Sequence, residues 1–142
     1  MLSLVFAFEV EDRIIGTIRM TPAVHDLTLT EGLLAAVVPD FRAQWPGSWD
    51  AGRLVLLPEC RAGQEVLRRC LHLVTTYLMQ YTDCQYLVGS CVHVLGRLYR
   101  RIGFTLVAQN VPLAGTNKSY TLIQGPLARV HTALAPEAAL PT

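Results

Sequence analysis

The turn that follows the predicted strand Arg53–Leu57 carries residue types that could bind a phosphate. Positions 54 to 57 of this strand are all apolar, as in a central strand buried on both faces. Pro58 ends the strand, and the next few residues lead into a strongly helical stretch. A helix N-terminus presents unpaired backbone N–H groups and a partial positive charge, so it can hold a pyrophosphate or the phosphate of phosphopantetheine. Gly63 would let the backbone approach such a ligand, and Arg61 would add positive charge. An ordinary strand-to-helix connection with a solvated arginine is the open alternative.

Tyr99 is a second candidate, in an amphipathic helix that we expect to end at Gly103. Apolar residues recur every fourth position from Val94 to Ile102, and glycine commonly follows the last turn of a helix. The helix would begin beside the end of a strand at 86–88, so Tyr99 could face a cleft and donate a proton to a leaving thiolate. A tyrosine packed at the sheet edge is equally compatible with the pattern.

Three arginines of the same helix could meet a negatively charged donor. Arg97, Arg100 and Arg101 could contact phosphates or an acidic carrier protein. More often such a cluster is simply a solvated helix face.

Polar residues also stand at the start of the central strand. Asp50 and Arg53 could orient a substrate, or they could form a structural ion pair. Arg19, at the end of the second predicted strand, could lie nearby. Three polar groups converging on an apolar sheet would form a substrate site, although each one alone more often has a structural role.

Length and composition describe one folded domain. The chain has 142 residues, 51% hydrophobic and 16% charged, which excludes a disordered chain. The net charge of +1 gives no sign of a nucleic-acid binder. We find no membrane span, no signal peptide and no CxxC pair, so we expect a cytoplasmic protein with free thiols. HxxH and HExxH motifs are absent, so we expect no metal.

Hydrophobic patterns predict the elements that must position these residues. Strands are expected at 1–10, 14–20, 53–57, 86–88, 104–108 and 119–123, and helices at 28–38, 66–81 and 94–102. Thr28 and Glu31 form a capping box that starts the first of these helices. We expect a loop at Asp40–Ser48, one domain over 1–126, and a C-terminal tail over 127–142 that holds a fragment of helix. A hairpin followed by βαβ units implies a mixed sheet with helices on both faces.

With these elements in place, the chain resembles the GNAT superfamily of acyltransferases. The resemblance rests on the order of elements, on the turn after Pro58, and on the segment Leu98–Phe104, where a tyrosine precedes a Gly-Phe step. It implies an α/β (α+β) fold with a mostly antiparallel sheet and an acyl thioester lying between two diverging strands. It also implies that Tyr99 is the acid, and that backbone N–H groups near Leu56 and Leu57 bind the thioester carbonyl.

The resemblance further assigns the donor's phosphates to the turn before the helix. Arg61, Gly63 and Gln64 would contact them, although the segment lacks the second glycine of the usual R-G-x-G pattern.

A closer resemblance is to the acyl-homoserine-lactone synthases and the related long-chain N-acyl amino acid synthases. The similar segments are 15–22 to the G-x-x-R-x-x-P strand, 49–53 to the W-E-x-S-R motif and 100–104 to the R-x-G-W step. This likeness implies that Arg19, Trp49, Asp50 and Arg53 occupy functional positions on the acceptor side.

The chain departs from this group at three points. Asp50 replaces the usual Glu, and Gly52 replaces the usual Ser. The family's N-terminal segment, which helps bind S-adenosylmethionine, has no counterpart before Met1. We therefore expect that the protein does not use S-adenosylmethionine in the way that is usual for this family.

Together these observations predict an acyltransferase. It would move an acyl group from a coenzyme A or acyl-carrier-protein thioester to a small-molecule amine, with Tyr99 and Asp50 as catalytic residues. One alternative is an inactive GNAT-like domain that binds a ligand or a protein, as a homodimer through its apolar surface. Another is an acetyl-coenzyme A acetyltransferase acting on a small amine or a protein terminus.

Overall fold

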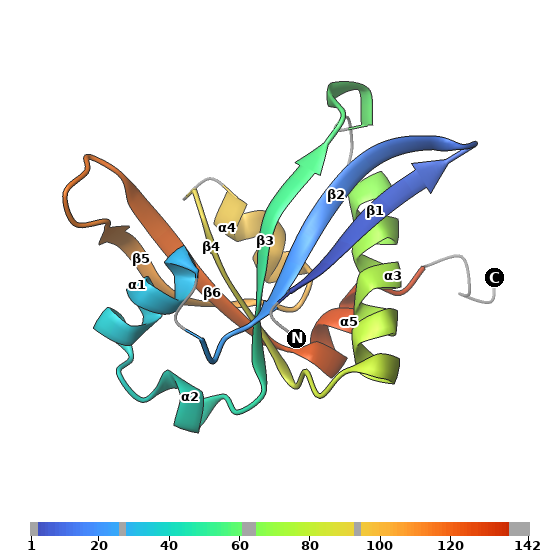
Figure 1. Ribbon diagram of the computed structural model, residues 1–142. Coiled ribbons are helices and arrows are strands. Elements are labelled where there is room, and N and C mark those ends of the chain that lie inside the picture. Colours follow the sequence, from blue (N-terminus) through green and yellow to red (C-terminus); the bar gives the residue numbers. More distant parts are fainter. Residues whose placement is uncertain (1–2, 26–27, 61–64, 93–94, 137–142) are drawn as a thin grey trace.

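A six-stranded sheet with helices on both faces forms the body of the protein (Figure 1). The computed structural model describes residues 3–25, 28–60, 65–92 and 95–136. The strands are β1 (Leu4–Val10), β2 (Arg13–Pro22), β3 (Ser48–Leu56), β4 (Tyr86–Cys91), β5 (Thr105–Pro112) and β6 (Ser119–Pro126). The helices are α1 (Leu29–Val37), α2 (Phe41–Gln44), α3 (Glu65–Tyr81), α4 (Gly96–Arg101) and α5 (Leu127–Leu134), with a 3-10 turn at Pro58–Cys60.

The strand order is β1-β2-β3-β4-β6-β5, and every neighbouring pair is antiparallel except β3 and β4. The mixed, mostly antiparallel sheet predicted from the sequence is confirmed. No helix in the described ranges is long and apolar enough to cross a membrane. All four cysteines are free thiols, and three of them are buried.

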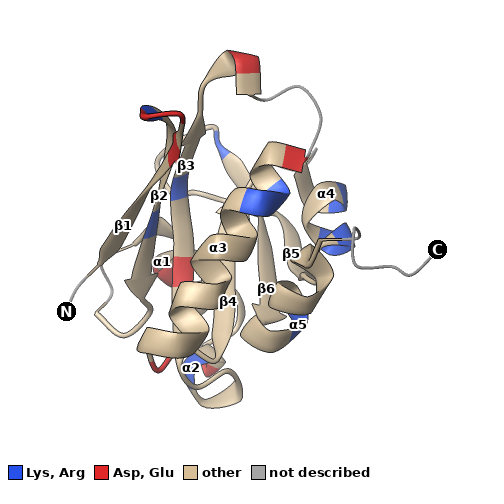
Figure 2. Cartoon of the chain, turned by 90° about the vertical axis from the view of Figure 1, so that its right-hand side faces the viewer, with Lys and Arg blue, Asp and Glu red and all other residues tan. Residues whose placement is uncertain are grey.

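Each face of the sheet is covered by its own hydrophobic core. Helices α3 and α5 lie side by side over one face (Figures 1 and 2), and α4 contributes Tyr99 to the same core, followed by the buried Ile102. Helices α1 and α2 cover the other face, where Leu34 and Phe41 are fully buried. We refer to these as the α3 face and the α1 face.

One segment differs from the sequence-based expectation. Asp40–Ser48, expected as a loop, contains α2, and β3 begins at Ser48 rather than at Arg53. Helix α5 is the fragment of helix expected at the start of the C-terminal tail, and it packs on α3 with Leu127, Val130 and Leu134 buried. Their spacing of three and four residues places all three on one side of a helix, so a short apolar stripe is enough to dock it.

The centre of the sheet is split. β3 pairs with β4 only from Ser48 to Asp50, beside Tyr86 to Val88, and the two strands then diverge (Figure 1). Beyond this point β3 stays paired with β2, while β4 stays paired with β6 as far as Cys91. The sheet therefore opens between two halves that each keep their own ladder.

A β-bulge in β3 changes which way its side chains point. Between the pairs Arg19–Gly52 and Thr17–Val55, β3 holds one residue more than β2, and Arg53 takes a φ of 54°. Without the extra residue, even-numbered positions would stay on one face. With it, Asp50 points to the α1 face, whereas Leu54 and Leu56 pack into the core of the α3 face.

The end of α4 fixes the position of Tyr99. The Phe104 N–H donates to the Tyr99 carbonyl (3.1 Å), the Gly103 N–H donates to the Arg100 carbonyl (3.4 Å), and Gly103 has a φ of 96°. These two bonds form a Schellman motif. Such a motif usually includes an apolar contact between its C″ and C3 positions, which are Phe104 and Tyr99 here. Their rings meet edge to face with centroids 5.7 Å apart. The predicted end of the helix at Gly103 is confirmed.

Substituting Gly103 should therefore damage both stability and the site. A Cβ there would lie 3.0 Å from Val130 Cα and 3.2 Å from the Arg129 carbonyl oxygen, at a φ that other residues seldom adopt. We expect Gly103→Ala to cost about 1–3 kcal/mol in the free energy of unfolding, measured by chemical denaturation. Gly32→Ala is the matched control: a Cβ at Gly32 meets nothing within 4 Å in α1. It should leave stability unchanged or raise it. Equal behaviour of the two variants would contradict this account of the turn.

Candidate functional site

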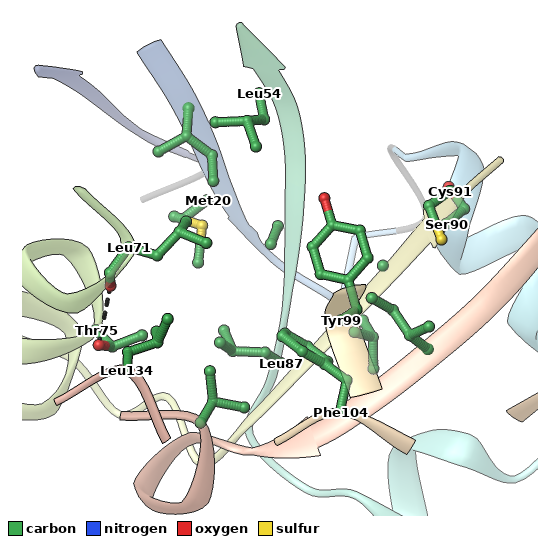
Figure 3. Close-up of a pocket in the computed structure, with 16 residues that line it drawn as sticks. Met20, Leu54, Leu71, Thr75, Leu87, Ser90, Cys91, Tyr99, Phe104 and Leu134 are labelled. Atoms are coloured by element: carbon green, nitrogen blue, oxygen red, sulfur yellow. Dashed lines mark hydrogen bonds between the residues drawn. The ribbon is translucent and has the colours of Figure 1, made fainter. Parts of the chain in front are cut away.

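An apolar pocket opens on the α3 face where β3 and β4 separate. Its volume is about 50 Å³. Ala51 and Gly89 face each other across the split, and the pocket continues between the sheet and helices α3 and α5. Its walls include Met20, Leu54, Leu71, Leu87, Phe104 and Leu134 (Figure 3). The lining of this small cavity between the diverging strands is mostly apolar, as the lining of an acyl site would be.

Tyr99 reaches into this pocket from α4. Figure 3 shows its ring next to Phe104 between the ribbons of β3 and β4, with the hydroxyl pointing away from Phe104. Burial raises the pKa of Tyr99, and the neighbouring Cys91 thiol adds to the rise. The phenol is therefore protonated at neutral pH and can act as a proton donor. None of the described residues accepts or donates a hydrogen bond at this hydroxyl, so it is available to a ligand.

Asp50 lies on the opposite face at the same split. Its pairing partners are Val88 in β4 and Thr21 in β2, and only 6% of its surface is exposed. Desolvation by burial raises the pKa of Asp50 from 3.8 to about 6; the Thr28 and Thr30 hydroxyls oppose the rise, and the negative charge of Glu31 adds to it. Oδ1 of this carboxylate has no hydrogen-bond partner among the described residues. A buried acceptor without a partner is costly, and it is expected where a ligand supplies the missing donor.

The start of α1 surrounds Asp50 with polar groups. Thr28 caps the helix by accepting from the Glu31 N–H (3.2 Å), as the capping motif predicted, and its hydroxyl donates to Glu31 Oε1 (3.2 Å). Glu31 is fully buried, and Arg42 of α2 pairs with it at 3.0 Å. The Thr30 hydroxyl meets the Ser90 hydroxyl of β4 at 2.9 Å. α1 is thus bound to β4 beside the split by polar contacts as well as by its apolar face.

The three other predicted acceptor-side residues, Arg19, Arg53 and Trp49, do not share one environment in the structure. Arg19 is exposed and pairs with Gly52 in the ladder, so it stands on the same face as Asp50. Arg53 is exposed at the bulge, and neither arginine forms a salt bridge with a described residue. Trp49 is buried on the α3 face, and its indole N–H donates to Asp83 Oδ1 (3.3 Å) at the closed end of the sheet.

The structure describes only some of the residues that were predicted to contact the acyl donor. The Leu57 N–H donates to the Ile15 carbonyl (2.8 Å), so it already has a backbone partner, and Leu56 is paired with Gly16 in the ladder. Arg61, Gly63 and Gln64 lie outside the described residues, and α3 begins directly after them at Glu65. Within the described ranges, no three His, Cys, Asp or Glu side chains gather as metal ligands would.

Sequence reasoning missed the polar partners of Asp50. The capping motif pointed to Thr28 and Glu31 as local helix residues, but it carried no sign that they face a strand residue. Nothing in the sequence around Ser90 or Arg42 singled them out. Their role follows from packing between elements that are distant along the chain.

The fold is similar to those of several solved proteins. The structure matches that of FeeM, an N-acyl amino acid synthase from uncultured soil microbes, with a TM-score of 0.75, 12% identity, and coverage of 94% of this chain and 77% of that one. It also matches the CoA-dependent acyl-homoserine lactone synthase BjaI (TM-score 0.61, 13% identity, 92% and 62% covered) and the synthase LasI (0.63, 15%, 92% and 68%). A search of curated proteins gave no match.

These likenesses show a shared fold. A sequence model of the N-acyl amino acid synthase FeeM family matches residues 2–125, and the chain belongs to that family. This membership confirms the predicted acyltransferase class, and the predicted likeness to the acyl-homoserine-lactone synthases is confirmed at the level of the fold.

The buried carboxylate of Asp50 should make the protein less stable at neutral pH than a variant with an uncharged side chain at this position. The folded-state pKa of Asp50, about 6, lies above the value of 3.8 for an unfolded chain. The stabilising contribution of this group is therefore complete below pH 3.8 and is lost as the pH rises through 6. We expect Asp50→Asn to raise the free energy of unfolding at pH 7.5 by about 1–3 kcal/mol, with a smaller gain toward pH 4.

Denaturation at several pH values measures this effect. Asp12→Asn is the control, because Asp12 is exposed in the β1–β2 turn. It should show no pH-dependent gain. An Asp50→Asn variant with the same pH dependence as the unmodified protein would contradict the buried, desolvated state of this carboxylate.

Proposed function

We propose that the protein transfers an acyl group from a coenzyme A or acyl-carrier-protein thioester to the amino group of an amino acid. One observation carries this proposal: the Tyr99 hydroxyl and the Asp50 carboxylate flank the split between β3 and β4 from opposite faces of the sheet. Acyl transfer needs a proton acceptor on the amine side and a proton donor on the thiolate side. The family to which the chain belongs supplies the acceptor class.

The donor would enter on the α3 face. Its acyl chain would occupy the apolar pocket, and its phosphates would lie near residues 61–64, as the sequence resemblance implies. Exposed arginines on α4, namely Arg97, Arg100 and Arg101, offer positive charge to phosphates or to an acidic carrier protein (Figure 2). BjaI, with a similar fold, binds isopentyl-CoA. We expect the reaction to take place in the cytoplasm.

The acceptor would enter on the α1 face. Its amine would approach Asp50 Oδ1, the carboxylate oxygen without a partner, and Arg19 stands on the same face to pair with a carboxylate of the acceptor. With a pKa of about 6, Asp50 is mostly ionised at pH 7 and can accept a proton. Because this pKa is close to the working pH, Asp50 can also release the proton again.

The acyl transfer needs no cofactor other than the thioester donor. The amine nitrogen attacks the thioester carbon and forms the N–C bond, while Asp50 takes the proton that the nitrogen loses. Backbone N–H groups of β3 beyond Asp50, where pairing with β4 has ended, would stabilise the oxyanion. The C–S bond then breaks, Tyr99 gives its proton to the thiolate, and the proton on Asp50 returns to solvent as Tyr99 is reprotonated.

Donor and acceptor panels test this function. Acetyl-, octanoyl- and palmitoyl-coenzyme A and the matching acyl-carrier proteins would be mixed with amino acids, and free thiol and N-acyl product followed. We expect thiol release that depends on an amino acid, and a raised melting temperature with the preferred donor. Donor binding without turnover would favour the inactive binding domain. Activity with acetyl-coenzyme A and simple amines alone would favour a plain acetyltransferase.

Tyr99→Phe tests the acid. The variant keeps the ring contact with Phe104 but loses the hydroxyl, so the fold should be retained. We expect kcat to fall about 10²-fold or more, in the range for loss of a general acid, with little change in the donor's KM. Unchanged turnover would exclude Tyr99 as the acid.

Leu134→Ala tests the acyl pocket. Leu134 is 2% exposed and lines the pocket from α5, so its truncation should lengthen the cavity. We expect kcat/KM to shift toward longer acyl chains by about tenfold relative to the shorter ones, together with a stability loss of about 2–4 kcal/mol. Leu73→Ala is the matched control, because Leu73 is 67% exposed on α3 and lies outside this pocket. The same chain-length preference in all three proteins would place the acyl chain elsewhere.

A further inference from the structure

We propose that Thr30 and Ser90 are positioning residues for Asp50, forming a hydrogen-bond chain in which Ser90 donates to Thr30 and Thr30 donates to the carboxylate. This inference rests on the proposed function. It adds two residues, from α1 and β4, that would direct Asp50 toward the acceptor amine.

Contacts across the split support the chain. The two hydroxyl oxygens are 2.9 Å apart, and Thr30 is 2% exposed. Ser90 lies two residues beyond Val88, the partner of Asp50 in the short β3–β4 ladder, so both side chains point to the α1 face. The hydroxyls of both Thr28 and Thr30 interact with Asp50. Three polar groups from α1, β3 and β4 therefore meet at the edge of the opening.

The chemistry of the groups sets the direction of the chain. An ionised carboxylate only accepts hydrogen bonds, and a hydroxyl has a single hydrogen to donate. Thr28 already gives its hydrogen to Glu31 Oε1 (3.2 Å). Thr28 therefore has to divide its one hydrogen between Glu31 and Asp50, whereas Thr30 can donate fully to Asp50 while it accepts from Ser90. One carboxylate oxygen would be held in this way, leaving Oδ1 for the amine.

The other charged side chains near Asp50 do not pair with it in the part of the chain that the structure describes. Glu31 of α1 is neutralised by Arg42 of α2 at 3.0 Å, and Arg19 of β2 stands on the same face but is exposed. Arg53 of β3 is exposed at the bulge. None of these cations forms a salt bridge with Asp50 in the part of the chain that the structure describes. The orientation of Asp50 therefore depends on hydroxyl groups.

Three variants test the chain in the full-length protein. Thr30→Val keeps the shape and removes the hydroxyl, Thr30→Ser keeps the hydroxyl, and Ser90→Ala removes its donor. The Asp50 pKa would be measured by carboxyl ¹³C NMR titration, assigned with Asp50→Asn, and kcat/KM would be followed against pH. We expect Thr30→Val to raise the Asp50 pKa and to lower kcat about tenfold or more, as loss of a hydrogen bond to a charged group predicts.

The remaining variants separate positioning from packing. Thr30→Ser should stay within about twofold of the unmodified protein, because it retains the donor. Ser90→Ala should change the pKa in the same direction as Thr30→Val, and the double variant should be no worse than Thr30→Val alone. Additive effects, or an Asp50 pKa that no variant changes, would overturn the proposal.

A remote threonine provides the control. Thr76 bonds through its hydroxyl to the His72 carbonyl (2.8 Å) and to His131 (3.0 Å) between α3 and α5. Thr76→Val removes a similar partly buried hydroxyl, so it should alter the melting temperature without changing the Asp50 pKa. A change of that pKa in Thr76→Val would count against the proposal. The titration needs no substrate, so an absence of acyl transfer would refute the proposed function while the pKa series still decides the hydrogen-bond chain.

Discussion

The separation of β3 from β4 is the constraint on which the rest of the structure depends. Two parallel strands that pair for only three residues would leave a weak sheet if nothing else held them. Here β3 is held by β2 and β4 by β6, so each half remains a paired sheet while the gap between them stays open. Unpaired backbone groups at such a gap must bond to something else, and a substrate with polar atoms meets that requirement.

The bulge in β3 gives the two sides of the gap different chemistry. One extra residue at Arg53 turns Leu54 and Leu56 toward the α3 core, although Asp50 faces the opposite side. The same strand thereby contributes an apolar wall to the pocket and a carboxylate to the other face. Bulges often lie next to active sites, where they redirect a side chain in this way.

Asp50 also shows how function opposes stability here. Desolvation raises the pKa of its carboxylate, and one oxygen has no partner among the described residues, so its burial costs folding free energy at neutral pH. The neighbouring Glu31 is buried as well, but Arg42 offsets its charge. The difference between the two carboxylates is that Glu31 is paired with a cation, whereas Asp50 keeps one oxygen without a hydrogen-bond partner among the described residues.

The sequence by itself determined the local features of this protein. Six strands, the main helices, the capped start of α1 and the glycine end of α4 all follow from periodicity and from single residues such as Thr28 and Gly103. Tyr99 could be singled out because its helix end is a local motif, whose hydrogen bonds join residues only a few positions apart. Motifs of the family also named Asp50 and Arg19 as acceptor-side candidates.

Only the tertiary structure decided what surrounds those candidates. Trp49 and Asp50 are neighbours in one motif, but strand alternation sends Trp49 into the α3-face core and Asp50 to the α1 face. The run after Arg53 was expected to be buried on both faces, yet Val55 is 55% exposed because the split sheet leaves that side uncovered. The contact between Thr30 and Ser90 joins residues 60 positions apart. No local pattern encodes such a contact, because it exists only once α1 has packed against β4.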